Sequence, residues 1–220
     1  MIWLRSHPRQ DTHVVIEVMA DSMRVGKTTA VGVIAEGLRR RGHTVTVSYE
    51  DWQHNPYLQK SYEDPAQNFL DSQQWFLRRK WEQLRQGGEG IFVQDVPPEM
   101  DYGYAETNRR LGRMSAQHFA QYDTYCQTLD WAAVPAPTLL VYLKVSDEEL
   151  LSRAHASRRE FEVIDDTYFL TMKQVNREWL ARGKQHMHIL EIDTDTLDFA
   201  HGERAKQTLL DSVCTRIGLG

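Results

Sequence analysis

The chain has 220 residues, of which 41% are hydrophobic and 26% are charged, and its formal net charge is −5. This composition is typical of a soluble protein with no membrane partner, and no apolar run approaches the ~20 residues needed to cross a bilayer. The negative charge argues against nucleic acid as the main partner.

The two cysteines, Cys126 and Cys214, are too few for a disulfide framework. They fit a reducing environment, so we expect a cytoplasmic protein. The length suits a single α/β domain over residues 1–220, which buries a sizeable core without disulfides or metal.

Apolar, strand-like runs alternate with longer helical stretches along the chain, as in a mostly parallel sheet that is covered by helices. We expect strands at 13–19, 43–50, 90–95, 138–145 and 186–193. A first helix follows Gly26 and stops at Gly42, and long helical stretches are expected at 65–86, 104–133 and 165–182. Ligands of such sheets bind beyond the carboxyl ends of the strands, where acidic residues such as Glu50 and Asp95 stand here.

The residues Gly26-Lys27-Thr28-Thr29, between the first strand and the first helix, match the end of the phosphate-binding pattern G-x-x-x-x-G-K-[ST]. Backbone amides from Arg24 and Val25 onward would hold phosphates, Lys27 would bridge the terminal phosphates, and the Thr28 hydroxyl would bind Mg²⁺. The alternative is a helix N-terminus that resembles the pattern by chance.

The pattern is altered at two places. Asp21 stands where the first glycine belongs, and Arg24 occupies another position where glycine supplies an unusual φ. A carboxylate at position 21 would repel phosphates unless it points away, whereas Arg24 would add a cation.

Three further segments follow in order: YEDWQHNPYLQKSYEDP from residue 49, QDVPPEMD from residue 94 and LLSRAHASRREFE from residue 150. Together with the phosphate loop, they resemble the deoxynucleoside kinases, particularly the bacterial deoxyadenosine/deoxyguanosine kinases, over roughly residues 14–182. The resemblance implies an α/β P-loop kinase fold. In that fold a five-stranded, mostly parallel sheet has helices on both faces, and an arginine-rich lid would lie at about residues 152–164.

The resemblance also implies roles for individual residues. Glu50 matches the general base that accepts a proton from the sugar 5′-hydroxyl, and Asp95 matches an acid that helps to hold Mg²⁺. Tyr62 and Glu162 match contacts to the 3′-hydroxyl, which predicts a preference for deoxyribose. On the base, Gln73 matches the residue that pairs with the base edge, Lys80 stands where a base-contacting arginine is usual, and Asp101 matches an acid of the base-recognition group.

In the expected lid, Arg153 and Arg159 match arginines that neutralise the triphosphate, and Arg158 stands beside Ser157, which replaces a third. Trp52, Phe76 and Tyr104 are candidates to stack on the base, and packing in the core is the alternative for each. The family's Asp-Arg-Ser triplet lacks its arginine here, because Val96 and Pro97 follow Asp95.

We therefore expect a kinase that uses ATP and Mg²⁺ to phosphorylate a deoxynucleoside, with a purine favoured through the bacterial resemblance. A nucleoside monophosphate kinase of the same fold stays open, with Arg79-Lys80 and Arg109-Arg110 as candidate cations for the acceptor's phosphate. An impaired nucleotide-binding or regulatory subunit also stays open, because of the altered loop. The extensive apolar faces of the long helices lead us to expect a homodimer.

Overall fold

The computed structural model describes residues 14–157 and 164–219, apart from the side chains of residues 66 and 67. Its strands are β1 (Val15–Ala20), β2 (Val45–Ser48), β3 (Ile91–Asp95), β4 (Leu139–Lys144) and β5 (Ile189–Asp193). Its α-helices are α1 (Lys27–Arg40), α2 (Leu58–Glu63), α3 (Pro65–Gln86), α4 (Pro98–Arg110), α5 (Ala116–Thr128), α6 (Asp147–Ala156), α7 (Asp166–Gly183) and α8 (Glu203–Arg216).

The five strands form one sheet in the order β2-β3-β1-β4-β5, and each pair of neighbours is parallel. This confirms the expected α/β architecture. Since the strands are parallel, their carboxyl ends meet at one edge, where Val18 of β1 is the partner of Asp95 of β3. The loop that follows β1 therefore begins next to the end of β3.

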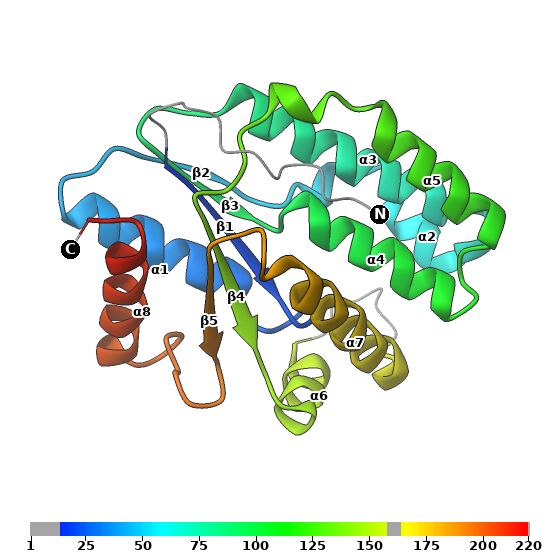
Figure 1. Ribbon diagram of the computed structural model, residues 1–220. Coiled ribbons are helices and arrows are strands. Elements are labelled where there is room, and N and C mark those ends of the chain that lie inside the picture. Colours follow the sequence, from blue (N-terminus) through cyan, green and yellow to red (C-terminus); the bar gives the residue numbers. More distant parts are fainter. Residues whose placement is uncertain (1–13, 158–163, 220) are drawn as a thin grey trace.

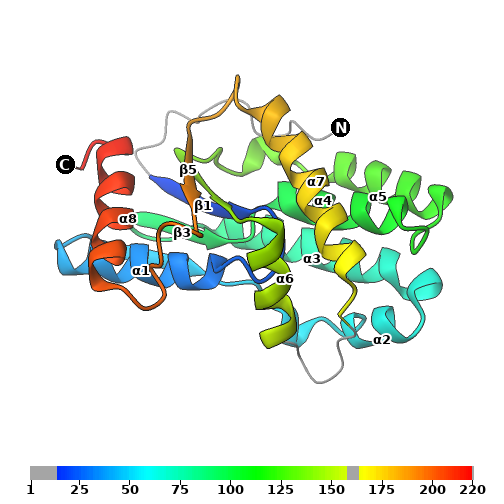
Figure 2. The same ribbon diagram turned by 90° about the horizontal axis from the view of Figure 1, so that it is seen from below.

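Helices cover both faces of this sheet (Figure 1), and alternate side chains of β1 pack on the two sides. Ile16 and Val18 belong to the core that contains α1 and α8, whereas Val15 and Met19 pack with the helices α3, α4, α5 and α7. The view from below separates α1 and α8 from α3, α4 and α5 (Figure 2). None of the helices in the described ranges is long and apolar enough to span a bilayer.

The single long helix expected at 104–133 is wrong, because this region contains the end of α4 and the separate helix α5. The chain leaves α4 at Gly112, which has a left-handed φ of 69°. It enters α5 through Ser115, whose side chain accepts a hydrogen bond from the amide of His118. These two local signals place a turn inside the segment, and α5 folds back to contact α3.

The stretches expected at 65–86 and 165–182 are confirmed as α3 and α7. The helix α8 adds to the expected elements and packs on α1, where Gly37 permits a close approach. A β-carbon at this glycine would lie 2.5 Å from a methyl group of Leu210. α1 is thereby held between the sheet and α8, which fixes the start of α1 at the carboxyl edge.

Candidate active site

The phosphate loop connects β1 to α1. Gly26 has a φ of 101° and directly precedes α1, so the first amides of the helix point toward any bound anion. Lys27 folds back over the loop, with Nζ 3.1 Å from the carbonyl oxygen of Ser22. Burial lowers the pKa of Lys27, and the charges of two nearby carboxylates offset part of this effect. The loop thus presents amides and an ammonium group, which are donors that bind phosphate.

Asp21 stands where the motif has its first glycine, and its side chain points toward β4 and α7. The fully buried carboxylate accepts hydrogen bonds from the hydroxyl of Tyr142 and the amide of Val145, each 3.0 Å long. Arg177 of α7 binds both of its oxygens, at 2.9 and 2.8 Å. The carboxylate therefore points away from the phosphate-binding loop, and Arg177 balances its charge.

Arg24 and Val96 both have a left-handed backbone, with φ of 63° and 62°. Such a φ is strained for residues other than glycine, above all for a β-branched one. Arg24 takes the place of a motif glycine, and its side chain lines both of the cavities described below. Val96 takes the place of the family's arginine, and its apolar side chain lines the first cavity without adding a cation.

Thr28 and Asp95, the two expected Mg²⁺ ligands, meet at the carboxyl edge of the sheet. The Thr28 hydroxyl donates to Asp95 Oδ2 over 2.6 Å. Asp95 Oδ1 is buried without a hydrogen-bond partner among the described residues, and burial raises the pKa of this carboxyl. A hydroxyl and a carboxylate with a spare oxygen are the hard ligands that Mg²⁺ prefers, so the residues present fit this ion.

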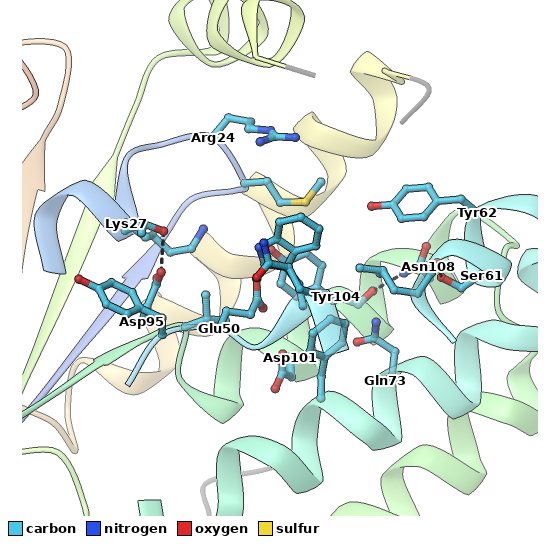
Figure 3. Close-up of a pocket in the computed structure, with 18 of the residues that line it drawn as sticks. Arg24, Lys27, Glu50, Ser61, Tyr62, Gln73, Asp95, Asp101, Tyr104 and Asn108 are labelled. Carbon is cyan, nitrogen blue, oxygen red and sulfur yellow. Dashed lines mark hydrogen bonds between the residues drawn. The ribbon is translucent and has the colours of Figure 1, made fainter. Parts of the chain in front are cut away.

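A cavity of about 470 Å³ extends from the phosphate loop to α3 and α4 (Figure 3). Lys27 and Asp95 lie at one end of it, Gln73 and Tyr62 lie at the other, and Glu50 lies between them (Figure 3). Most of the expected site residues line this cavity: Arg24, Gly26, Lys27, Thr28, Thr29, Glu50, Trp52, Tyr62, Gln73, Phe76, Asp95, Asp101 and Tyr104.

The end of the cavity farther from the phosphate loop contains unsatisfied acceptors. Gln73 Oε1 and Asp101 Oδ2 are buried and have no hydrogen-bond partner among the described residues. Burial raises the pKa of Asp101 to about 7, although the charge of Lys80 acts in the opposite direction. Because buried polar atoms are nearly always paired, these two oxygens indicate contacts that a ligand would complete.

Lys80 is not among the described residues that line the cavity, so the expectation that it contacts the base needs correction. Its side chain is 2% exposed, and Nζ donates to Asp101 Oδ1 over 2.6 Å and to Glu50 Oε1 over 3.2 Å. Burial alone would lower the pKa of Lys80, but the two carboxylates raise it above its ordinary value. The amine is therefore charged and lies behind the cavity wall.

Sequence reasoning missed several residues that line this cavity, including Ser61, Asn108 and Tyr168. Asn108 is fully buried, and its Nδ2 donates to the carbonyl oxygen of Tyr104. Its Oδ1 has no hydrogen-bond partner among the described residues. The sequence contained a signal for Asn108. Asp101, Tyr104 and Asn108 stand at i, i+3 and i+7, so they share one face of α4.

A second cavity, of about 690 Å³, lies on the other side of the phosphate loop and includes Val25 and Arg153. Arg153, expected in the lid, donates to the side chain and carbonyl oxygen of Thr194 at 3.0 and 3.1 Å. It also donates to the carbonyl oxygen of Val25 at 3.4 Å. Arg153 thus ties the phosphate loop to the loop between β5 and α8. The other expected lid residues, Arg158, Arg159 and Glu162, lie outside the described residues.

Comparisons with known proteins agree with this geometry. A family model described as deoxynucleoside kinase matches residues 18–217. A deoxyadenosine/deoxycytidine kinase of Bacillus subtilis is 26% identical over 207 residues, which cover 92% of this chain and 93% of the relative. A deoxyguanosine kinase of the same organism is 24% identical over 149 residues, which cover 66% of this chain and 72% of the relative.

The fold is also that of solved structures. A deoxyadenosine kinase from M. mycoides with bound dATP superimposes with a TM-score of 0.77 at 18% identity, covering 93% of this chain and 100% of that one. The same kinase with the products dCMP and dCDP gives a TM-score of 0.78 at 18% identity, covering 92% and 99%. Because the family model matches nearly the whole length of this chain, the chain belongs to the deoxynucleoside kinase family.

Proposed function

We propose that this kinase transfers the γ-phosphoryl group of ATP, with Mg²⁺, to the 5′-hydroxyl of a purine deoxynucleoside. The observation that carries the proposal is the position of Glu50 in the first cavity. This carboxylate lies between the phosphate loop and the end where Gln73 and Asp101 keep spare acceptors (Figure 3). A nucleoside with its base at that end would have its sugar beside Glu50 and the phosphate loop.

Phosphoryl transfer needs alignment and neutralisation of charge more than covalent chemistry. In our proposal Glu50 accepts the proton of the 5′-hydroxyl, and Lys27 and the amides at the start of α1 bind the donor's phosphates. Thr28 and Asp95 would hold Mg²⁺, which when bound neutralises phosphate charge. Arg24 and Arg153 would contribute further positive charge where the two cavities adjoin the loop.

The end of the cavity proposed for the nucleobase fits a base edge that carries an amine. Gln73 Oε1 and Asp101 Oδ2 both lack partners among the described residues, and both accept hydrogen bonds. An exocyclic amine, such as N6 of adenine or N4 of cytosine, donates to such oxygens. We place a purine first, because the names of both Bacillus relatives include a purine deoxynucleoside.

The sugar would lie near Tyr62, which lines the cavity from α2. We propose that Tyr62 contacts the 3′-hydroxyl, as the family resemblance implies, together with Glu162. The aromatic rings of Trp52, Phe76 and Tyr104 also line this space. They offer apolar surface for the base to stack on.

A monophosphate kinase would need free cations around the acceptor's phosphate, and the candidate cations are engaged elsewhere. Arg109 and Arg110 both bind Glu106, while Arg79 binds Asp51 at 2.9 Å. None of these three arginines lines the first cavity in the described part of the chain. The geometry therefore favours a nucleoside over a nucleoside monophosphate.

The proposal is tested by ADP release from ATP and Mg²⁺ with each of the four deoxynucleosides, and with their monophosphates in parallel reactions. We expect turnover with a purine deoxynucleoside and none with the monophosphates. Turnover with monophosphates alone would select the rival kinase. Binding of ATP without turnover on any acceptor would refute the proposed reaction.

The role of Glu50 is tested by Glu50→Gln, which keeps the shape of the side chain and removes its basicity. We expect turnover to fall by about 10²-fold or more, with unchanged affinity for ATP, because a general base contributes in that range. Glu36→Gln is the matched control, since Glu36 pairs with Arg40 on the exposed surface of α1. Equal turnover in Glu50→Gln and the wild type would remove Glu50 from the mechanism.

A further inference from the structure

Lys80 forms a buried link between two carboxylates of the first cavity. It extends from α3, while Glu50 follows β2 and Asp101 belongs to α4. One amine lies 3.2 Å from Glu50 Oε1 and 2.6 Å from Asp101 Oδ1. A charged amine is stable in such a place only when it is paired, so the three side chains depend on one another.

Each carboxylate gives one oxygen to Lys80 and keeps the other. Asp101 Oδ2 is buried and has no hydrogen-bond partner among the described residues. Glu50 uses Oε1 for Lys80, which leaves Oε2 for a substrate proton. Both acids line the cavity, whereas Lys80 does not. The lysine therefore acts on a substrate through the side chains that it contacts, which are these two acids and the ring of Phe76, 5.0 Å from its amine.

The segment that contains Glu50 is docked on α3 by two consecutive cations. Lys80 binds Glu50, and the neighbouring Arg79 binds Asp51 Oδ2 at 2.9 Å. The two contacts differ in burial, because Arg79 is 40% exposed and Lys80 is 2% exposed. Val96 lines the same cavity with an apolar side chain. The cation that contacts Glu50 thus comes from α3 and not from the end of β3.

We propose that Lys80 is a positioning residue, which holds the proton-accepting carboxylate of Glu50 and ties it to the base-recognising carboxylate of Asp101. The inference rests on the proposed function, since it assumes that Glu50 acts on the 5′-hydroxyl. When a nucleobase binds to Asp101, the 5′-hydroxyl of that nucleoside then lies at a fixed distance from the carboxylate of Glu50. Lys80 in this way connects recognition at one end of the nucleoside to catalysis at the other.

The test compares steady-state kinetics of the wild type, Lys80→Met, Lys80→Arg and the control Arg78→Met with ATP and the best deoxynucleoside. We expect Lys80→Met to lower kcat by about 10²-fold, since a misplaced general base loses most of its effect. Lys80→Arg should recover activity to within about tenfold, because it restores a cation between the two acids. Arg78→Met should stay close to the wild type, because Arg78 pairs with Glu82 on the exposed surface of α3, and the KM for ATP should be the same in all four proteins.

Lys80→Met leaves two carboxylates without their cation and could fail to fold, so a second pair of variants is needed. Asp101→Asn keeps the contact between Lys80 and Glu50, whereas the double variant Lys80→Met/Asp101→Asn removes it together with the charge of residue 101. We expect the double variant to have a kcat about 10²-fold below that of Asp101→Asn. Equal kcat values in these two folded proteins would overturn the inference.

The outcomes separate this inference from the function that it rests on. If the wild type turns over a deoxynucleoside and Lys80→Met does so equally well, the proposed function stands and the role of Lys80 is refuted. If the wild type turns over no deoxynucleoside, the proposed function fails and the inference fails with it. A loss of kcat that Lys80→Arg does not recover would point to packing rather than positioning, and would also refute it.

Discussion

The carboxylate of Asp21 is bound by groups of two other elements, Tyr142 of β4 and Arg177 of α7, and by the amide of Val145. An acidic residue at the entrance of a phosphate loop looks unfavourable when only its neighbours in the sequence are considered. In the folded protein it joins the loop to β4 and α7. Arg24, three residues later, keeps the left-handed φ that a glycine would adopt freely.

Restoring the motif glycine at position 21 should harm the protein. Asp21→Gly leaves the buried Tyr142 hydroxyl and the half-exposed Arg177 without their partner. Breaking such a pair costs about 3 kcal/mol of unfolding free energy. Urea denaturation of the variant and the wild type measures this difference.

Arg24→Gly is the control for that experiment. The glycine adopts a φ near the observed 63° without strain, so we expect the unfolding free energy to stay the same or rise. If Arg24 contributes a cation to the donor, the KM for ATP should rise in this variant. Greater stability of Asp21→Gly than of the wild type would contradict our interpretation of Asp21.

At the scale of elements, hydrogen bonds from α7 hold the start of the phosphate loop. Asn176 of α7 donates from Nδ2 to the carbonyl oxygens of Ala20 and Asp21, each over 3.1 Å. Its Oδ1 faces α4, where a β-carbon on Gly103 would lie only 2.3 Å away. The close contact of α4 with α7 therefore requires a glycine at position 103.

Gly103→Ala should destabilise the protein by about 1–3 kcal/mol, the usual effect of overpacking. Asn176 cannot move away without losing its bonds to the loop. Gly32→Ala is the matched control, because Gly32 is also helical but nothing lies within 4 Å of an added β-carbon. It should stabilise the protein by roughly 0.5–1 kcal/mol. Thermal denaturation measures the shift in Tm of each variant. Equal shifts in Tm for the two variants would disprove this account.

The same two helices are joined by Arg110 of α4, which binds both carboxylate oxygens of Glu178 in α7 at 3.1 and 2.7 Å. These hydrogen bonds lower the pKa of Glu178 below its ordinary value of 4.5. A pKa lowered by folding means that the pair stabilises the folded state above pH 4.5 and that this contribution is lost as the pH falls further.

Acidification from about pH 6 to about pH 3.5 should therefore lower the Tm of the wild type more than that of Arg110→Met. The difference should be small, ~1 kcal/mol or less, because both side chains are partly exposed. Arg40→Met is a control, since the ion pair of Arg40 with Glu36 lies within α1 and does not join α4 to α7. An Arg110→Met protein with the pH dependence of the wild type would show that Arg110 contributes nothing through either of its partners, Glu178 and Glu106.

At the scale of the whole molecule, the helices on one face of the sheet also cover one another. α5 folds back on α3, and apolar residues of both helices share a core with α4. The exposed large hydrophobic side chains in the described ranges are Tyr49 and Tyr57, and neither lies on these helices. The apolar faces of these helices therefore cover one another in part. The homodimer itself stays a prediction, which sedimentation analysis would test.

The proposed donor site lies where β1, β3 and α1 meet, so its occupancy should stabilise the whole fold. At an ATP–Mg²⁺ concentration about 100 times the Kd, we expect a gain of about 2.7 kcal/mol and a rise in Tm of roughly 5–10 °C. Chelation of Mg²⁺ with EDTA should reduce the rise, and Lys27→Met should abolish it. No rise in Tm at saturating ATP–Mg²⁺ would contradict a working phosphate loop.

The sequence by itself determined the order and type of the main elements. The apolar run at 138–145 forms β4, and the stretch at 65–86 forms α3 between Pro65 and Gly87. Such patterns are local, because hydrophobic period, proline and glycine act within a few residues of each other. The resemblance to the family also singled out Glu50, Gln73 and Asp101, which the structure brings to one cavity.

Only the tertiary structure decided which side chains meet. Asp21 and Arg177 are 156 residues apart, and Lys80 reaches acids that are 30 and 21 residues away. The local hydrophobic pattern does not indicate such partners. They depend on how parallel strands and their crossover helices return the chain to one edge of the sheet. The sequence therefore identified the phosphate loop and the acids of the site. The tertiary structure determines that the Asp21 side chain points away from the phosphates and that Lys80 contacts Glu50. The reason is that a buried charge is stable only when a group of opposite charge lies close to it.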